Sequence, residues 1–476
     1  MSSKKYLSKW FRPESIFYTI FLASTALLFI NGLNSFISSS EFWSIYLSQK
    51  LFSWQLTWSS VYLKPAFHLV LAVIYLFKLN DFYHIYVAKI LFSLNGVFQF
   101  FLIYKIFISL FRSRIICLLQ TLFLFLSPVF LANYYRIRSD QMALTLFLLF
   151  IVVSISNWPF KKWLQLFIFF LFPAIAMKHL YFSALSLFFL PLRNYWEIFQ
   201  KQNLLRKTLI ALALMNLFLW GLYAAKEPLH YFLETYNSEL SHLVQLKLWI
   251  KADFPYLILS FFPYLVTGFR RFMSKNNLTC FFFSQCLIIF IIFIHPQKLP
   301  FFLASLTLVL YFPAAFFLQY LMELKFVNKM LLALTITLVT VCNLQFAKKY
   351  FHLFTLNNPQ LITIERLSNI ITDKDLTYLD GMGLLPRAKN IGCFVSPDDE
   401  TSNKFCLDSL RNRTPDAIIL TNRLLGLPFD FFSLEKNGYK IIGPNLFIRK
   451  ELVESFKNEV TEWPAPSIIF SFDQLY

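Results

Sequence analysis

Two carboxylates in a strongly apolar chain are the first candidates for chemistry. Glu41 lies in the segment Ser-Ser-Ser-Glu-Phe-Trp, and Asp140 ends the segment Tyr-Tyr-Arg-Ile-Arg-Ser-Asp. Ionisable residues at membrane depth are costly and often functional. Each acid also has a structural interpretation. Ser40 would be an N-cap with Glu41 in the first helical turn, and Asp140 would cap the following helix.

Basic residues also lie at or near the ends of the apolar runs. The planar fork of an arginine suits phosphate. Each lysine alone could instead be snorkelling to the membrane surface, and each histidine could be an ordinary interfacial residue. Taken together they predict a phosphate-binding surface on one side of the membrane. Its candidate residues are Lys64, Arg136, Arg138, Lys178, His179, His295 and Lys298.

Membrane helices must position these residues. The chain of 476 residues is 57% hydrophobic and only 15% charged, whereas a soluble globular protein is about 25% charged. Residues 348–476 hold 15 basic and 16 acidic residues, so residues 1–347 hold the remaining 29 basic and 10 acidic residues. The positive excess therefore lies in short loops between apolar runs, which is typical of topology signals and argues against nucleic-acid binding.

The apolar runs predict an all-α polytopic bundle. A cytoplasmic N-terminus and an outer, interfacial segment 61–79 place every basic cluster on the cytoplasmic side. This arrangement gives about 11 transmembrane helices, with an uncleaved first helix and a long first outer loop over 32–81. The twelve apolar segments are 15–31, 61–79, 82–111, 114–132, 141–157, 163–177, 181–194, 207–225, 255–269, 278–295, 299–322 and 328–347.

The C-terminal residues differ in character and predict a second domain. We expect a transmembrane domain over 1–347 and a small soluble α/β domain over 348–476 on the outer side. In the second domain the pattern predicts a helix and several strands separated by turn signals such as Asp-Gly, Asn-Gly and Gly-Pro. Cys393 and Cys406 could form a disulfide there if the domain faces an oxidising compartment. The expected elements are a helix over 359–371 and strands over 376–379, 417–420, 440–442 and 446–448.

The order of these motifs resembles the GT-C superfamily of integral-membrane glycosyltransferases, which use polyprenyl-phosphate-linked sugars. Members include aminoarabinose transferases, protein O-mannosyltransferases and lipid-linked mannosyltransferases. Ser40-Glu41 stands where the family commonly has an Asp-Glu pair in its first outer loop. Lys64-Pro65, Lys89 and Arg138-Ser139-Asp140 are similar to further family positions in the same order. His295 and Lys298, followed by two phenylalanines, are similar to a His-Lys motif of the mannosyltransferase branch, whose arginine is absent here.

The resemblance implies transfer of a sugar from a polyprenyl-phosphate donor to a hydroxyl of a glycan, lipid or protein acceptor, in the bacterial inner membrane. One carboxylate takes the acceptor proton, and cationic groups stabilise the phosphate that leaves. Glu41 is expected to be the base with Asp140 assisting, and the reverse assignment stays open. The lipid supplies an activated donor, so no nucleotide-binding motif is needed and none is present. The sequence identifies no cofactor and no metal cluster, which leaves divalent-metal dependence open.

Two other classes of function remain open. A transporter or lipid flippase would place ionisable groups near the bilayer midplane and interrupt its helices with Gly or Pro. The predicted spans carry little charge at mid-depth, with Lys89 as the main exception. A structural or assembly protein without catalysis would not need acids and bases gathered on one face.

Overall fold

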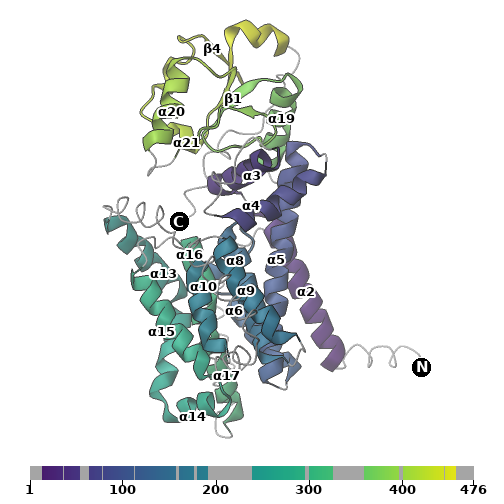
Figure 1. Ribbon diagram of the computed structural model, residues 1–476, viewed down its shortest axis with the longest axis vertical. Coiled ribbons are helices and arrows are strands. Elements are labelled where there is room, and N and C mark those ends of the chain that lie inside the picture. Colours follow the sequence, from purple (N-terminus) through teal and green to yellow (C-terminus); the bar gives the residue numbers. More distant parts are fainter. Residues whose placement is uncertain are drawn as a thin grey trace, which may run out of the picture. The chain divides into compact units, whose positions relative to one another are not determined.

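The computed structural model is mostly helical, with one small sheet (Figure 1). It describes residues 13–35, 37–53, 64–77, 79–111, 113–156, 160–175, 179–190, 239–294, 300–324, 359–395, 400–443 and 445–456. The contacts divide the chain into two compact units. The first, here called the helical unit, contains Met1–Gly32, Ser93–Tyr135 and Ser139–Leu353. The second, the sheet unit, contains Leu33–Phe92, Arg136–Arg138 and Phe354–Tyr476.

The division groups the first predicted outer loop with the C-terminal residues. The loop forms α3 (Ser39–Phe52), α4 (Pro65–Ala72) and the 3-10 helix η2 (Val73–Leu76). Because α4 and η2 together hold only 12 residues, they are about 18 Å long at 1.5 Å per residue, whereas the hydrocarbon core is about 30 Å thick. This helical segment is therefore shorter than the hydrocarbon core is thick.

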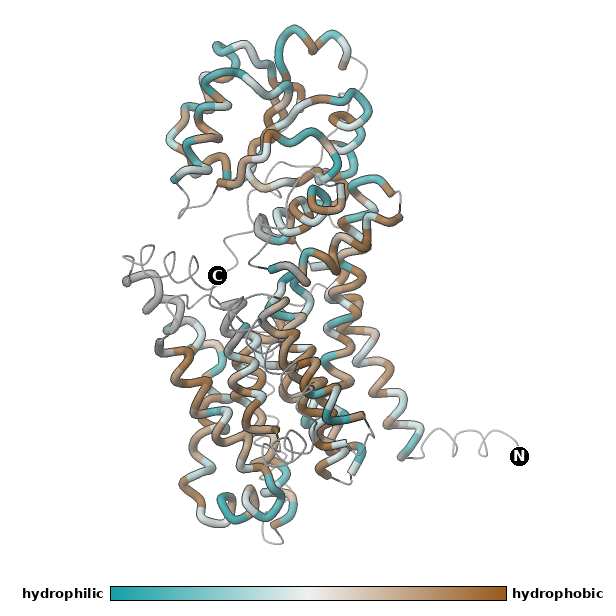
Figure 2. The backbone as a smooth tube through the Cα atoms, viewed as in Figure 1, coloured by the Kyte–Doolittle hydropathy of each residue, from teal (hydrophilic) through white to brown (hydrophobic). Residues whose placement is uncertain are grey.

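Apolar helices make up the helical unit, and Figure 2 shows hydrophobic residues along most of their length. Three helices in the described residues are long and apolar enough to cross a membrane, or four if one pair bent by 91° is a single span. The chain is thus compatible with a membrane protein. The helices of the unit, including two that begin or end in the sheet unit, are α2 (Pro13–Asn34), α5 (Asp81–Leu110), α6 (Arg114–Phe125), α7 (Pro128–Leu131), α8 (Ser139–Ile155), α9 (Lys161–Ile175), α10 (Leu180–Ser186), η4 (Leu187–Phe189), α13 (Glu239–Phe261), η5 (Phe262–Leu265), α14 (Thr267–Lys275), α15 (Thr279–Ile294), α16 (Pro300–Leu310) and α17 (Phe312–Glu323).

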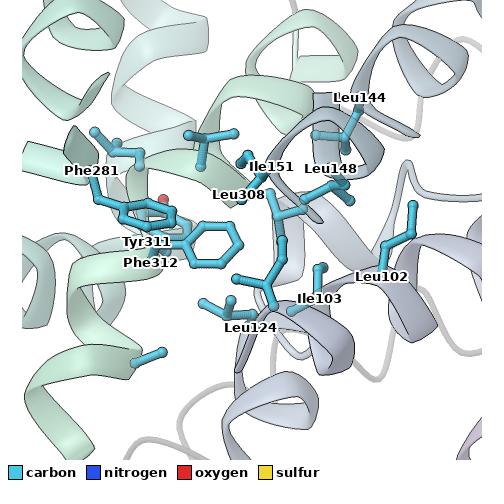
Figure 3. Packing of buried hydrophobic residues seen from close by; sticks show 14 of the residues in the cluster. Leu102, Ile103, Leu124, Leu144, Leu148, Ile151, Phe281, Leu308, Tyr311 and Phe312 are labelled. Carbon is cyan, nitrogen blue, oxygen red and sulfur yellow. The ribbon is translucent and has the colours of Figure 1, made fainter. Parts of the chain in front are cut away.

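Phenylalanine and leucine fill the core of this unit. Phe312 packs against Phe281 with 5.1 Å between ring centroids, and Leu124, Leu148 and Leu308 lie around them (Figure 3). Burying one such side chain contributes about 1.5–3 kcal/mol when the reference is water. In a bilayer that gain is small, and close packing and hydrogen bonds hold helices together instead. Gln99 of α5 supplies such bonds, because its Nε2 donates to the Gln141 carbonyl of α8 at 3.0 Å.

Three helix breaks in the helical unit meet at one buried carboxylate. Asp253 has non-helical backbone angles inside α13, where Pro255 removes a backbone donor. Its Oδ2 accepts hydrogen bonds from Ser127 Oγ, at the start of α7, and from the Tyr311 hydroxyl, between α16 and α17, each at 2.9 Å. Its Oδ1 accepts from Val129 N at 3.4 Å. One of these donors is a backbone N–H and two are hydroxyls, and Asp253 supplies them with an acceptor that lipid cannot provide.

The C-terminal part of the sheet unit is an α/β domain. Its strands are ordered β2-β1-β3-β5-β4, with β1 parallel to β2 and β3, and β5 antiparallel to its neighbours. The predicted helix and strands are confirmed within two residues at each end. A short strand, a helix before β3 and small helical turns were not predicted. The elements are α19 (Pro359–Asp373), β1 (Thr377–Leu379), β2 (Lys389–Asn390), α20 (Glu400–Arg411), β3 (Ala417–Ile419), α21 (Asn422–Leu425), η7 (Phe431–Ser433), β4 (Tyr439–Gly443), β5 (Leu446–Arg449) and η8 (Lys450–Phe456).

A disulfide joins Cys393 to Cys406 of α20, as the sequence left open. Both cysteines are buried in a cluster that includes Leu379 of β1 and Ile418 of β3. The bond links the segment that follows β2 to α20. It therefore holds this segment against α20, where few other side chains are apolar.

We predict that replacing Asp253 by leucine destabilises the helical unit strongly. The change leaves the hydroxyls of Ser127 and Tyr311 buried without their acceptor, at about 1–3 kcal/mol for each group. Thermal unfolding in detergent micelles measures the loss, and Tyr311→Phe is the control because it removes one hydrogen bond and leaves the carboxylate. If Asp253→Leu unfolds at the temperature of the wild type, Asp253 does not hold the three breaks together.

Candidate functional site

Glu41 lies at the start of α3, where it forms a capping box with Ser38. Its Oε2 accepts from Ser38 N at 2.7 Å and from Ser38 Oγ at 2.6 Å. The first turn of a helix favours a negative charge because its N–H groups point outward. The residue is only 2% exposed, so these contacts take the place of water around its carboxylate.

The same carboxylate reaches a segment that is distant in sequence. Its Oε1 accepts from Ile137 N at 2.7 Å, and Arg136 Nη1 donates to Oε2 at 3.3 Å across 95 residues of sequence. Lys89 of α5 is buried as well, donates to the Ser35 carbonyl and attracts Glu41 electrostatically. Glu41 thus accepts three hydrogen bonds at Oε2 and one at Oε1. This geometry favours an anchor for the Arg136–Arg138 segment over a base with free access to a substrate.

A serine and a histidine join α3 to α4. Ser48 Oγ lies 2.9 Å from His68 Nδ1, and both side chains are buried. Lys64, a predicted phosphate ligand, is the half-buried N-cap of α4 and precedes Pro65 at the first helical position. The pKa of His68 is lowered to about 3, mainly by burial and in smaller part by the nearby positive charge of Lys64. His68 is therefore neutral at physiological pH and serves to pack the two helices.

Asp140 and His179 come together in the helical unit. Asp140 is the second residue of α8, and its Oδ1 lies 4.0 Å from His179 Nε2. His179 is the N-cap of α10, and its Nδ1 lies 3.1 Å from the Tyr181 hydroxyl. Both residues are almost fully buried. The 4.0 Å between Asp140 and His179 is an ion-pair distance and is longer than a hydrogen bond, so the carboxylate and the imidazole lie close together without a direct hydrogen bond.

The predicted site residues thus fall into two groups and a remainder. Glu41, Arg136, the half-buried Arg138 and Lys64 belong to the sheet unit, and Asp140 belongs with His179 to the helical unit. The other candidates, Lys178, His295 and Lys298, lie outside the described residues. Within the described ranges, no group of three or more His, Cys, Asp or Glu side chains could hold a metal ion.

Two polar clusters were missed as sites from the sequence. Asp253 was not singled out, because it lies two residues before the predicted apolar segment 255–269. The combination of an acid and Pro255 two residues later, inside a long apolar helix, is the signal that could have located it. The Ser48–His68 contact left no such signal, since neither residue stands in a recognisable motif.

Comparisons with protein-family models, with curated proteins and with solved structures find no match to this chain. The likeness to membrane glycosyltransferases therefore rests on the residues of the chain itself.

We predict that folding stability falls at acid pH through His68. Between pH 6.5 and about 3 the unfolded chain binds a proton at this histidine and the folded chain does not. The contribution of His68 is therefore fully present above pH 6.5 and is lost as the pH falls, by about 2 kcal/mol at pH 5.

Thermal unfolding measured from pH 7.5 to pH 5 tests this linkage. His68→Asn is the matched variant, because its amide can keep the hydrogen bond to Ser48 and cannot be protonated. The variant should lose less stability than the wild type over this range. Parallel pH profiles would show that His68 does not titrate differently in the two states.

Proposed function

We propose that the protein is a membrane glycosyltransferase that moves a sugar from a polyprenyl-phosphate donor to an acceptor hydroxyl. The observation that carries the proposal is the buried pair of Asp140 and His179, directly after the arginine-rich segment in sequence. The proposed reaction needs a base, and it needs cationic groups that stabilise a leaving phosphate. Asp140 can supply the first, and Arg136 and Arg138 the second.

The contacts of each acid support a division of roles. Asp140 takes the acceptor proton, and the imidazole of His179, 4.0 Å from its carboxylate, stabilises the charge of the site. Glu41 fixes Arg136 and the backbone of Ile137, so that the arginines stay in place when the donor leaves. This assignment reverses the expectation from the family position of Glu41, because the carboxylate of Glu41 is already occupied by four donors. Lys64, Lys178, His179, His295 and Lys298 stay further candidates for the phosphate.

A second candidate function, transport or flipping of a lipid-linked glycan, is favoured by the helix breaks at Asp253. Broken helices around a buried acid are common at transporter sites. Against this candidate, the side-chain and backbone partners given above for Asp253 are donors, which compete with a cation for the carboxylate. Movement of a labelled lipid-linked sugar across liposomes, without transfer to an acceptor, would support it.

The proposed orientation has eleven crossing helices, a cytoplasmic N-terminus and the α/β domain in the periplasm. The basic clusters in the short loops support it through the positive-inside rule, and the short α4–η2 segment supports an interfacial position for 61–79. The Cys393–Cys406 disulfide supports the placement of the domain, because such bonds persist in oxidising compartments.

We predict that Asp140→Asn lowers turnover by about 10²–10⁴-fold and leaves donor binding nearly intact, because an amide cannot accept the proton. Glu41→Gln and Arg138→Ala should mainly weaken donor use, about tenfold or more, since a charge-assisted contact contributes about 1.5–3 kcal/mol. Purified protein and a panel of polyprenyl-phosphate hexoses supply the assay. Glu323→Gln is the matched control, because Glu323 is an exposed acid on the proposed inner side. If Glu41→Gln and Asp140→Asn both remain active, the glycosyltransferase proposal fails.

The orientation predicts that a cysteine placed at position 112 or 161 is labelled only from the cytoplasmic side. Both positions carry basic residues in proposed inner loops. A membrane-impermeant thiol reagent applied to intact spheroplasts should leave them unmodified and should react after lysis. A cysteine at Lys440, in the proposed periplasmic domain, is the positive control. Labelling of position 112 or 161 in intact spheroplasts would contradict the orientation.

A further inference from the structure

Three aromatic rings and two cations form a continuous stack within the sheet unit. Trp43 of α3 lies between Tyr46 and Phe394, with ring centroids 4.8 and 4.9 Å away and nearly parallel planes. Lys50 Nζ lies 5.3 Å from the centroid of the Tyr46 ring, and Arg423 Cζ lies 5.3 Å from that of Phe394. Both faces of Trp43 are therefore covered, and the stack connects α3 to the α/β domain.

This contact is made where α/β folds usually bind ligands. Gly383, Phe394 and Arg423 follow β1, β2 and β3, so they lie beyond the carboxyl ends of the three parallel strands. In open α/β sheets this edge is the usual position of a ligand crevice. Here α3 occupies it with Trp43 and Tyr46.

Glycine makes the close approach of α3 to this edge possible. Gly383 has a φ of +73°, and a Cβ added there would lie 2.7 Å from Tyr46 Cβ and 3.1 Å from Trp43 Cε3. The loop that carries it is fixed from within, because the buried Asp380 carboxylate accepts from the backbone N–H groups of Met382, Gly383 and Leu384. This rigid loop, which has no side chain at Gly383, is therefore the surface on which α3 packs.

The α/β domain holds the beginning of α3 at a second point. Gln360 of α19 accepts a hydrogen bond from Ile37 N at 3.0 Å and donates one to the Ile37 carbonyl at 2.9 Å. Ile37 directly precedes Ser38, which forms the capping box with Glu41. The two points lie on either side of Glu41 in sequence, so they fix the residue from both directions.

We propose that the α/β domain is a positioning element: it seats α3 on the carboxyl edge of its sheet and thereby holds Glu41, and through Glu41 the Arg136–Arg138 segment. The disulfide stabilises the surface on which α3 packs, because Cys393 precedes Phe394 and is bonded to Cys406 of α20. Trp43, Gly383 and Gln360 are positioning residues and touch no substrate. The consequence for donor binding rests on the proposed function, whereas the consequence for the order of α3 does not.

Two glycine variants of the full-length protein test the proposal. Gly383→Ala drives a methyl group into Tyr46 and Trp43, whereas the nearest atom to a Cβ at Gly392 is Tyr46 Oη at 3.9 Å. Both glycines have a positive φ, +73° and +87°, so both variants strain the backbone and only the first displaces α3. Hydrogen exchange of peptides covering 39–52 and 136–138 should accelerate at least tenfold in Gly383→Ala and stay near wild type in Gly392→Ala.

A pair of variants at Trp43 tests the positioning role if Gly383→Ala does not fold. Trp43→Ala removes the ring between Tyr46 and Phe394 and should accelerate exchange in both peptides. Trp43→Phe keeps a flat ring there and should restore most of the protection. Equal protection of α3 in Trp43→Ala and Trp43→Phe, or in Gly383→Ala and Gly392→Ala, would overturn the proposal.

Sugar transfer by the same variants separates this inference from the proposed function. If the variants show the exchange pattern and the wild type transfers no sugar, the positioning role holds and the glycosyltransferase proposal fails. If it transfers sugar and the donor KM of Gly383→Ala rises at least tenfold above that of Gly392→Ala with a smaller change in kcat, both hold. Sugar transfer with α3 protection that does not depend on Gly383 would overturn the positioning role alone.

Discussion

A buried carboxylate must be surrounded by donors, and the sheet unit depends on how Glu41 meets this constraint. The carboxylate takes its donors from three places in the sequence: its own helix cap at Ser38, the backbone of Ile137 and the side chain of Arg136. Removing any one of them would leave the buried carboxylate with fewer donors, which is costly in a medium of low dielectric constant. The cap of one helix and the end of a distant segment are therefore fixed by a single group.

The same constraint is met differently at the other two acids. Asp253 lies at a break in its own helix and takes its donors from the breaks between α6 and α7 and between α16 and α17. Asp140 lies beside His179, a group that can carry a proton and not merely donate a fixed hydrogen bond. Glu41 and Asp253 are therefore suited to hold structure, whereas the role proposed for Asp140 is chemical. This contrast is why we assign the acids different roles although all three are buried.

Local patterns were sufficient for some of the fold. The strands 446–448 and 417–420 are short apolar runs bounded by turn residues, and the structure confirms them as β5 and β3. The strand Lys389–Asn390 could not be predicted, since it has no apolar pattern and is held by parallel pairing to β1. Sequence order placed Glu41 and Arg136 on one predicted side, but not in contact. It also could not show that Trp43 faces the α/β domain, since nothing in 41–50 distinguishes a lipid-facing tryptophan from one that stacks on Phe394.

A double-mutant cycle on Glu41 and Arg136 tests most directly whether Glu41 is an anchor. The free energy of unfolding is measured in micelles for the wild type, Glu41→Gln, Arg136→Gln and the double variant. If Glu41 is an anchor, we expect a coupling energy of about 1–3 kcal/mol, as for a buried, charge-assisted contact. The double variant should then lose less free energy of unfolding than the two single variants lose together. Additive effects within about 0.5 kcal/mol would show that the two residues act independently, and would contradict the anchor on which the assignment of Asp140 as base depends.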